Sequence, residues 1–164
     1  MKKSSVITLI AAFSLPFLMT ACNQQGSAPA AAAEDDSPEG QAIGYRQGLM
    51  EAMSWKTVRL RGMASGDQPM DEAVFKKDAH DIAALAGMIA EGFIPNSAKE
   101  GSAALPEIWM NFEDFTKKAA ELQTGMQGVA DAADQNGVEA AKGMVQAAAT
   151  CGNCHRPYRR RAAE

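Results

Sequence analysis

The stretch CGNCHRPYRR, residues 151–160, gathers most of the reactive side chains of this 164-residue chain close to its C-terminal end. It holds two of the three cysteines and one of the two histidines. In a Cys-x-x-Cys-His motif the two thiols can add to the vinyl groups of a haem, and the adjacent histidine can coordinate the iron. The motif therefore predicts one covalent haem at Cys151 and Cys154, with His155 as an iron ligand.

Two other chemistries use closely spaced cysteines. A zinc site needs further ligands, and the only other histidine, His80, falls on the solvent side of its predicted helix. A thioredoxin-like redox pair accompanies a βαβ pattern, which this sequence lacks. A disulfide between Cys151 and Cys154 would close too short a loop to stabilise the fold much. Haem attachment is the favoured interpretation.

The N-terminal segment MKKSSVITLIAAFSLPFLMTAC, residues 1–22, has the features of a secretory signal. Two lysines precede an apolar run that is too short for a membrane span. The small residues before Cys22 resemble a bacterial lipobox. We therefore expect residues 1–21 to be a signal peptide, Cys22 to be lipidated, residues 22–38 to be a disordered Ala/Pro/Ser-rich tether, and residues 39–164 to fold. An ordinary signal peptide that is cleaved nearby is the alternative.

The net charge of the chain and its expected export exclude some classes of function. Removing residues 1–21, which hold two lysines and no acid, changes the formal net charge from −4 to −6. An acidic chain of this kind does not suit nucleic-acid binding, which favours a basic surface. We expect a periplasmic protein that is anchored to a bacterial membrane, with the choice of inner or outer membrane left open.

Apolar residues recur every three or four positions in four segments, which predicts four amphipathic helices. The predicted core positions are Ile43, Met50, Met53, Thr57, Leu60 and Ala64; Phe75, Ala79, Ile82, Ala86, Ile89 and Phe93; Ile108, Phe112, Phe115, Ala119, Leu122 and Met126; and Val138, Ala141, Val145, Ala148, Gly152 and His155. The segments SGDQP (65–69), IPNS (94–97) and DQNG (134–137) separate them. The pattern predicts an all-α, antiparallel four-helix bundle.

One arginine is placed on an apolar helix face. Arg46 shares its face with Ile43 and Met50, and a buried guanidinium needs a partner. A haem brings two propionates, so we expect Arg46 and Arg159, which lies one turn beyond His155, to pair with them. The other arginines of residues 156–161 are expected to complement the helix macrodipole.

Three segments resemble the class II c-type cytochromes, a family that includes cytochrome c prime and its low-spin relatives. They are CGNCHRPYR (151–159), YRQGLM (45–50) and PEIW (106–109), and the resemblance extends over residues 39–161. It implies a four-helix bundle with one haem c between the helices. It also implies thioether roles for Cys151 and Cys154, a proximal ligand in His155, propionate-side positions for Arg46, Gln47 and Arg159, and a distal position for Met50.

The resemblance leaves two functions open. In the low-spin branch a methionine at the position of Met50 is the sixth ligand, and the protein carries electrons between redox partner proteins. In the cytochrome c prime branch the iron is five-coordinate and binds nitric oxide or carbon monoxide. We favour the non-enzymatic electron carrier, because a peroxidase needs a distal acid–base group that solvent-facing His80 does not supply. A purely structural lipoprotein is disfavoured, because it would not explain why Arg46 and His155 are placed on apolar helix faces. The sequence leaves monomer or homodimer open.

Overall fold

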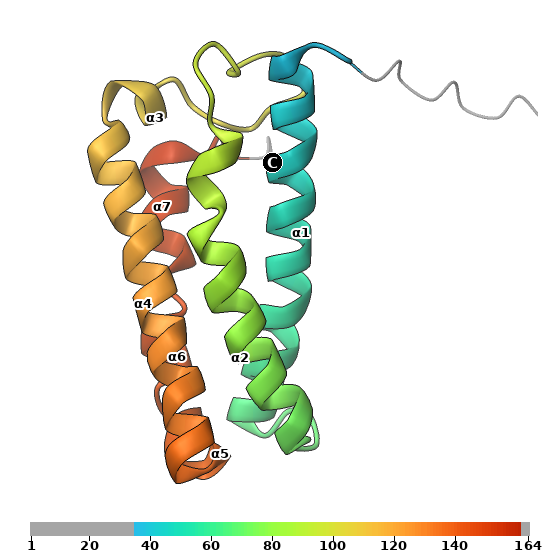
Figure 1. The fold of residues 1–164 in the computed structure, drawn as a ribbon, viewed down its shortest axis with the longest axis vertical. Helices are drawn as coiled ribbons and strands as arrows, with labels where there is room; N and C mark the ends of the chain where they lie inside the picture. Colours follow the sequence, from blue (N-terminus) through green and yellow to red (C-terminus); the bar gives the residue numbers. More distant parts are fainter. Residues whose placement is uncertain (1–34, 162–164) are drawn as a thin grey trace, which may run out of the picture. The chain divides into compact units, whose positions relative to one another are not determined.

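The computed structural model describes residues 35–161, and this part of the chain is mostly helical (Figure 1). The predicted signal peptide, Cys22 and the tether up to residue 34 lie outside the described residues. The elements are α1 (Pro38–Ser65), α2 (Glu72–Gly87), the 3-10 helix η1 (Ile89–Gly92), α3 (Glu107–Met110), α4 (Phe112–Asn136), α5 (Val138–Lys142), α6 (Val145–Ala148) and α7 (Cys151–Tyr158). Among them, no helix is both long and apolar enough to cross a bilayer.

The helices form the predicted four-helix bundle. Helix α1 is the first member, α2 with η1 the second, α3 with α4 the third, and α5, α6 and α7 together the fourth. Helix α2 packs against both α1 and α4, and α4 also packs against α5, α6 and α7. The long α4 is therefore the element that links the second helix to the C-terminal segment.

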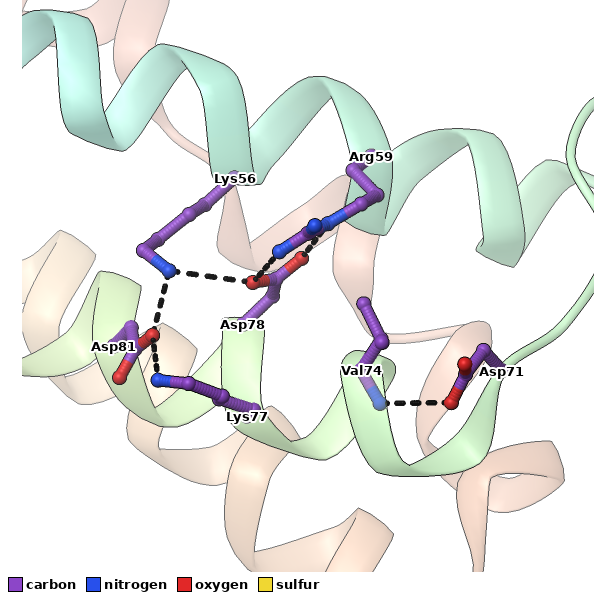
Figure 2. A network of polar contacts seen from close by, with 7 residues as sticks. All are labelled: Lys56, Arg59, Asp71, Val74, Lys77, Asp78 and Asp81. Atoms are coloured by element: carbon purple, nitrogen blue, oxygen red, sulfur yellow. Dashed lines mark hydrogen bonds and ion pairs between the residues drawn. The ribbon is translucent and has the colours of Figure 1, made fainter. Parts of the chain in front are cut away.

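The ends of the first helices follow from local chemistry. Ser37 caps α1 by accepting a hydrogen bond from the Gly40 amide, and Gly66 ends it in the left-handed region at φ 85°. The side chain of Asp71 caps α2 by accepting from the Val74 amide at 3.0 Å (Figure 2). The predicted boundary at residues 65–69 is confirmed, and α1 begins one residue before the predicted domain start.

Most of the predicted core positions are buried. The stripe of the second helix, from Phe75 to Phe93, is buried throughout. Met50, Thr57 and Ala64 are half-buried in α1. Phe112 is wrong as a core position because Asn111 leaves helical geometry between α3 and α4, which turns the following side chain outward to 40% exposure.

The fourth helix is not continuous, which corrects the prediction of a single segment. It breaks after Lys142 and again at Ala149, whose backbone adopts φ −79° and ψ 70°. Val138, Ala141, Val145 and Ala148 are buried as predicted. The second break lies where the Ala149 carbonyl accepts a hydrogen bond from the Arg61 side chain at 3.1 Å. Helix α7 therefore begins with a new helical phase.

A polar network fastens α1 to α2 (Figure 2). The fully buried carboxylate of Asp78 accepts two hydrogen bonds from Arg59, each 2.6 Å long, and a weaker one from Lys56 at 3.4 Å. Lys56 also bonds Asp81 at 2.6 Å, and Lys77 bonds the same oxygen at 2.7 Å. These hydrogen bonds lower the pKa of Asp81. Breaking such a buried pair is costly, so the network fixes α1 against α2.

Candidate functional site

Helix α7 carries both cysteines and the histidine of the motif. Cys151 and Cys154 are free thiols, half-buried and three residues apart, so they lie on one face of the helix. Burial raises the pKa of Cys154 to about 11, which keeps its thiol protonated. Partial desolvation of the ring by the protein around it, followed by the positive charge of Arg159, lowers the pKa of His155. This favours the neutral imidazole that can bind a metal.

His155 is exposed, which corrects the prediction that it points inward. The prediction extended the stripe of Val145 and Ala148 through Gly152 to His155. The non-helical backbone at Ala149 interrupts that phase, so Gly152 and His155 do not continue the buried face. The ring therefore stands at the surface of α7 beside two partly buried thiols.

The described residues contain no set of side chains that could form the alternative zinc site. Residues 35–161 contain no group of three or more His, Cys, Asp or Glu side chains that could hold a metal ion. His80 is exposed on α2, as predicted, with its Nε2 2.8 Å from Oδ2 of Asp134 on α4. This hydrogen bond lowers the pKa of Asp134.

Arg46 is only 4% exposed, as predicted, but its partners are neutral. Nη1 donates to the carbonyl of Gly92 and the hydroxyl of Ser97, both at 2.9 Å. Nη2 donates to the carbonyl of Ser97 and the hydroxyl of Ser102, both at 2.6 Å. Among the described residues, neutral acceptors of the 92–102 segment therefore satisfy the guanidinium. Burial lowers the pKa of Arg46, and pairing with a propionate stays a prediction.

An aromatic cluster joins the end of α7 to the same region. The ring of Tyr158 meets Phe115 edge-on with centroids 5.5 Å apart, and Phe115 meets Phe93 at 4.6 Å. Phe93 also contacts Trp109, and the Arg46 guanidinium lies 5.0 Å from the Phe93 ring centre. The segments YRQGLM, PEIW and CGNCHRPYR therefore meet at one end of the bundle.

One contact at this end was not predicted from the sequence. The Tyr158 hydroxyl donates to Oδ2 of Asp114 on α4 at 2.5 Å. The bond raises the pKa of Tyr158 to about 12 and lowers that of Asp114. The spacing of Tyr158 four residues after Cys154 signals a shared helix face, but the sequence does not identify the acceptor.

Backbone hydrogen bonds join the end of α7 to the segment that precedes α3. The Leu105 amide donates to the Tyr158 carbonyl at 3.0 Å, and the Arg160 amide donates to the Ala103 carbonyl at 2.8 Å. Gln47 on α1 donates to the carbonyl of Gly101 at 2.9 Å. The 101–105 segment thus connects α1 with the end of α7.

Arg61 connects α1 to the residues just before α7. Its Nη2 donates to the carbonyl of Ala149, two residues before Cys151, while its Nε is buried without a hydrogen-bond partner in the described part of the chain. Arg61 was not among the predicted site residues. Its spacing of eleven residues from Met50, close to three full turns, is the signal that both lie on one face of α1.

The chemistry of these side chains fits a covalently held haem, which needs two free thiols and a neutral imidazole. Helix α7 packs against α3 and α4, whereas α1 packs against α2, η1, α5 and α6. The face of α1 that Arg61 joins to the start of α7 also carries the half-buried thioether of Met50. Two free thiols and an imidazole that favours its neutral form stand on α7. The Arg61 side chain reaches Ala149 just before them, and its buried Nε has no hydrogen-bond partner among the described residues.

Arg159 lies directly after α7 in extended geometry and forms an isolated bridge with Ala104. It is exposed. Its charge is one of the two causes that lower the pKa of His155. Arg159 therefore lies close enough to the haem-binding motif to act on it electrostatically. No contact tests the predicted pairing with a propionate.

Comparison with known proteins gives one family. A family model described as Cytochrome C' matches residues 41–159. The chain is 37% identical over 116 residues to cytochrome c-556 of Agrobacterium fabrum, covering 70% of this chain and 77% of that protein. It resembles the structure of cytochrome c prime from Shewanella frigidimarina with a TM-score of 0.67 and 31% identity, covering 76% and 98% of the two chains. It also resembles the nitric oxide complex of a cytochrome c prime mutant from Alcaligenes xylosoxidans, with a TM-score of 0.63, 29% identity and coverage of 76% and 98%.

Proposed function

Because the chain belongs to the cytochrome c prime family and its cofactor is one covalent haem c, we propose that it is an electron carrier of the bacterial periplasm. Cys151 and Cys154 hold the haem by thioether bonds, His155 is the proximal ligand and Met50 is the sixth ligand. The haem supplies a one-electron iron couple, and His/Met ligation raises its potential.

The observation that carries this proposal is the position of Met50 on α1. Arg61 lies on the same face and bonds the carbonyl of Ala149, which precedes Cys151 by two residues. The face that bears Met50 is therefore the one turned toward the start of α7. Met50 is half-buried, so its sulfur is neither locked in the centre of the core nor left in open solvent.

Arg46 and Gln47 on α1 and Arg159 after α7 are not equally suited to bind a haem propionate. Gln47 and Arg159 are exposed, so each can pair with a carboxylate without giving up a buried partner. Arg46 would have to exchange a hydrogen bond to Ser97 or Ser102. We expect Arg46 to act mainly by holding the 92–102 segment against α1.

A five-coordinate gas-binding protein is the second candidate. Met50 packs against the hydrophobic core, which is the ordinary behaviour of a methionine in a bundle and would let it cover the iron without binding it. A cytochrome c prime of similar fold has been solved as a nitric oxide complex. In this candidate, nitric oxide or carbon monoxide takes the sixth position.

The cellular location is also part of the proposal. Residues 1–21 act as a lipoprotein signal peptide, Cys22 carries the lipid, and residues 22–38 tether the folded domain to the membrane. The order of charged, apolar and small residues before Cys22 supports this assignment.

One spectroscopic experiment separates the two functions. Visible absorption spectra of the oxidised and reduced full-length protein are recorded with and without carbon monoxide. An electron carrier with a methionine ligand gives low-spin spectra that carbon monoxide leaves unchanged. A high-spin protein whose reduced spectrum changes on adding carbon monoxide is instead the gas-binding form.

A further inference from the structure

Charge is distributed unevenly along the described chain. Residues 35–155 hold ten basic and eighteen acidic residues, whereas residues 156–161 hold four arginines and no acid. The four arginines are all exposed. A strongly basic surface therefore directly follows His155 in a protein that is otherwise acidic.

This basic segment is held in place by the fold. Arg156 is in the last turn of α7. Arg159 bridges Ala104, and the amide of Arg160 donates to the carbonyl of Ala103 at 2.8 Å. Tyr158, in the middle of the segment, is anchored to Asp114. The arginines are thus presented on a fixed backbone, which lowers the entropy lost when a partner binds.

The four arginines also lack the partners that other basic residues have. In the described residues, Lys56, Lys76, Lys77, Lys99, Lys118 and Lys142 each meet a carboxylate. No carboxylate within residues 35–161 forms an ion pair with an arginine of residues 156–161. Within residues 35–161, the Arg156 side chain bonds only the neutral side-chain oxygen of Asn153, at 2.8 Å.

Intramolecular roles account for only part of this cluster. The helix macrodipole favours a cation in the last turn, which explains Arg156 alone. A haem propionate would engage Arg159. Neither role explains Arg160 and Arg161, which follow the helix and remain exposed.

We propose that Arg156, Arg160 and Arg161 form a docking surface for the acidic face of a redox partner protein. Guanidinium groups bind carboxylates in a two-pronged geometry, and a basic patch on an acidic protein orients an approaching acidic partner toward one place. That place is the end of the helix that bears His155. This inference rests on the proposed electron-carrier function.

The test uses the full-length haem protein in a neutral detergent. Its retention on a carboxymethyl resin at pH 7 measures binding to carboxylates without any electron transfer. Stopped-flow oxidation of the reduced protein by hexacyanoferrate(III), which takes one electron from the ferrous protein, measures the charge near the haem. We expect the wild type to be retained despite its net negative charge, and its oxidation rate to fall as ionic strength rises.

Three variants complete the design. The triple variant Arg156→Gln/Arg160→Gln/Arg161→Gln should pass through the resin and be oxidised about tenfold more slowly at low ionic strength. The triple Lys variant at the same positions keeps the charge and should behave as the wild type. Lys142→Gln changes one charge on α5, outside the arginine cluster of residues 156–161, and should have little effect.

Several results would overturn the docking surface. They are passage of the wild type through the resin, equal retention of the triple Gln variant, or a wild-type rate that rises with ionic strength. Binding to phosphatidylglycerol vesicles that depends on the arginines, without resin retention, would assign the surface to the membrane instead. A retained wild type that binds carbon monoxide would refute the electron carrier alone, so the two failures can be told apart.

Discussion

Tyr158, the last residue of α7, donates a 2.5 Å hydrogen bond to Asp114 on α4 and so fixes the end of the helix that carries the haem-binding motif. The ring of Tyr158 is buried against Phe115, which brings the hydroxyl to the surface of α4. The position of His155, one turn earlier, depends on this anchor.

Replacing Tyr158 by Phe should make the free energy of unfolding less dependent on pH between pH 7 and pH 3. The hydrogen bond from Tyr158 is the first cause of the lowered Asp114 pKa, followed by that from Lys118. A lowered carboxyl pKa stabilises the fold above the unfolded value near pH ~4, and this stability is lost as pH falls through the folded pKa. Urea unfolding should show Tyr158→Phe less stable than the wild type at pH 7, with a smaller difference at pH 3.

Tyr45→Phe is the matched control, because Tyr45 bonds the exposed Glu91 at 2.9 Å. It should change stability little at either pH. A difference between wild type and Tyr158→Phe that is the same at pH 7 and pH 3 would show that the bond does not tune Asp114.

Replacing Arg61 by Met should weaken the junction between α1 and the start of α7. The Ala149 carbonyl loses its charged donor, a loss of about 2 kcal/mol in the free energy of unfolding. Urea unfolding of the haem protein measures the stability, and the visible spectrum reports iron ligation. Arg61→Lys, which keeps a cation on the same stem, should recover part of the loss. Equal stability of wild type and Arg61→Met would show that the bond from Arg61 to Ala149 does not stabilise this junction.

Replacing both Cys151 and Cys154 by Ser should abolish covalent haem. The wild type, produced with a haem-attachment system, should keep its haem through acid–organic extraction, and its denatured mass should include one haem. Each single variant retains one thiol and should keep one thioether bond. A colourless wild type that binds zinc would contradict the assignment.

Replacing Cys22 by Ala should release the protein from the membrane fraction. Stable anchoring needs more than one acyl chain, which a lipidated N-terminal cysteine can supply. Fractionation of cells that express each form, followed by immunoblotting, measures the distribution. Release of the wild type to the same extent as the variant would favour an ordinary signal peptide.

The fold and the haem motif could be predicted from sequence because both depend on local patterns. The apolar spacing of the second helix matches its burial from Phe75 to Phe93. The extrapolated stripe failed at His155, because two non-helical residues, Ala149 and Thr150, change the helical phase before α7. Burial of Arg46 was predicted, but its neutral partners in the 92–102 segment were not.

The contacts that escaped prediction join residues far apart in the chain. Arg61 and Ala149 are 88 positions apart, and Tyr158 and Asp114 are 44 apart. No local periodicity marks such pairs, because they arise only when the helices pack. These contacts fix the two ends of α7 against α1 and α4. They therefore set the orientation of the predicted haem ligands relative to α1.

The most direct measurement is the spin state of the haem protein with and without Met50. Met50→Ala should convert a low-spin spectrum to a high-spin one and allow the reduced protein to bind carbon monoxide, since the sixth ligand is removed. Met53→Ala is the matched control. Met53 is 6% exposed in the core, so its loss should cost about 2–5 kcal/mol of stability and leave the spectrum low-spin. A wild type that is already high-spin, with iron coordination unchanged in Met50→Ala, would contradict Met50 ligation and establish the gas-binding alternative.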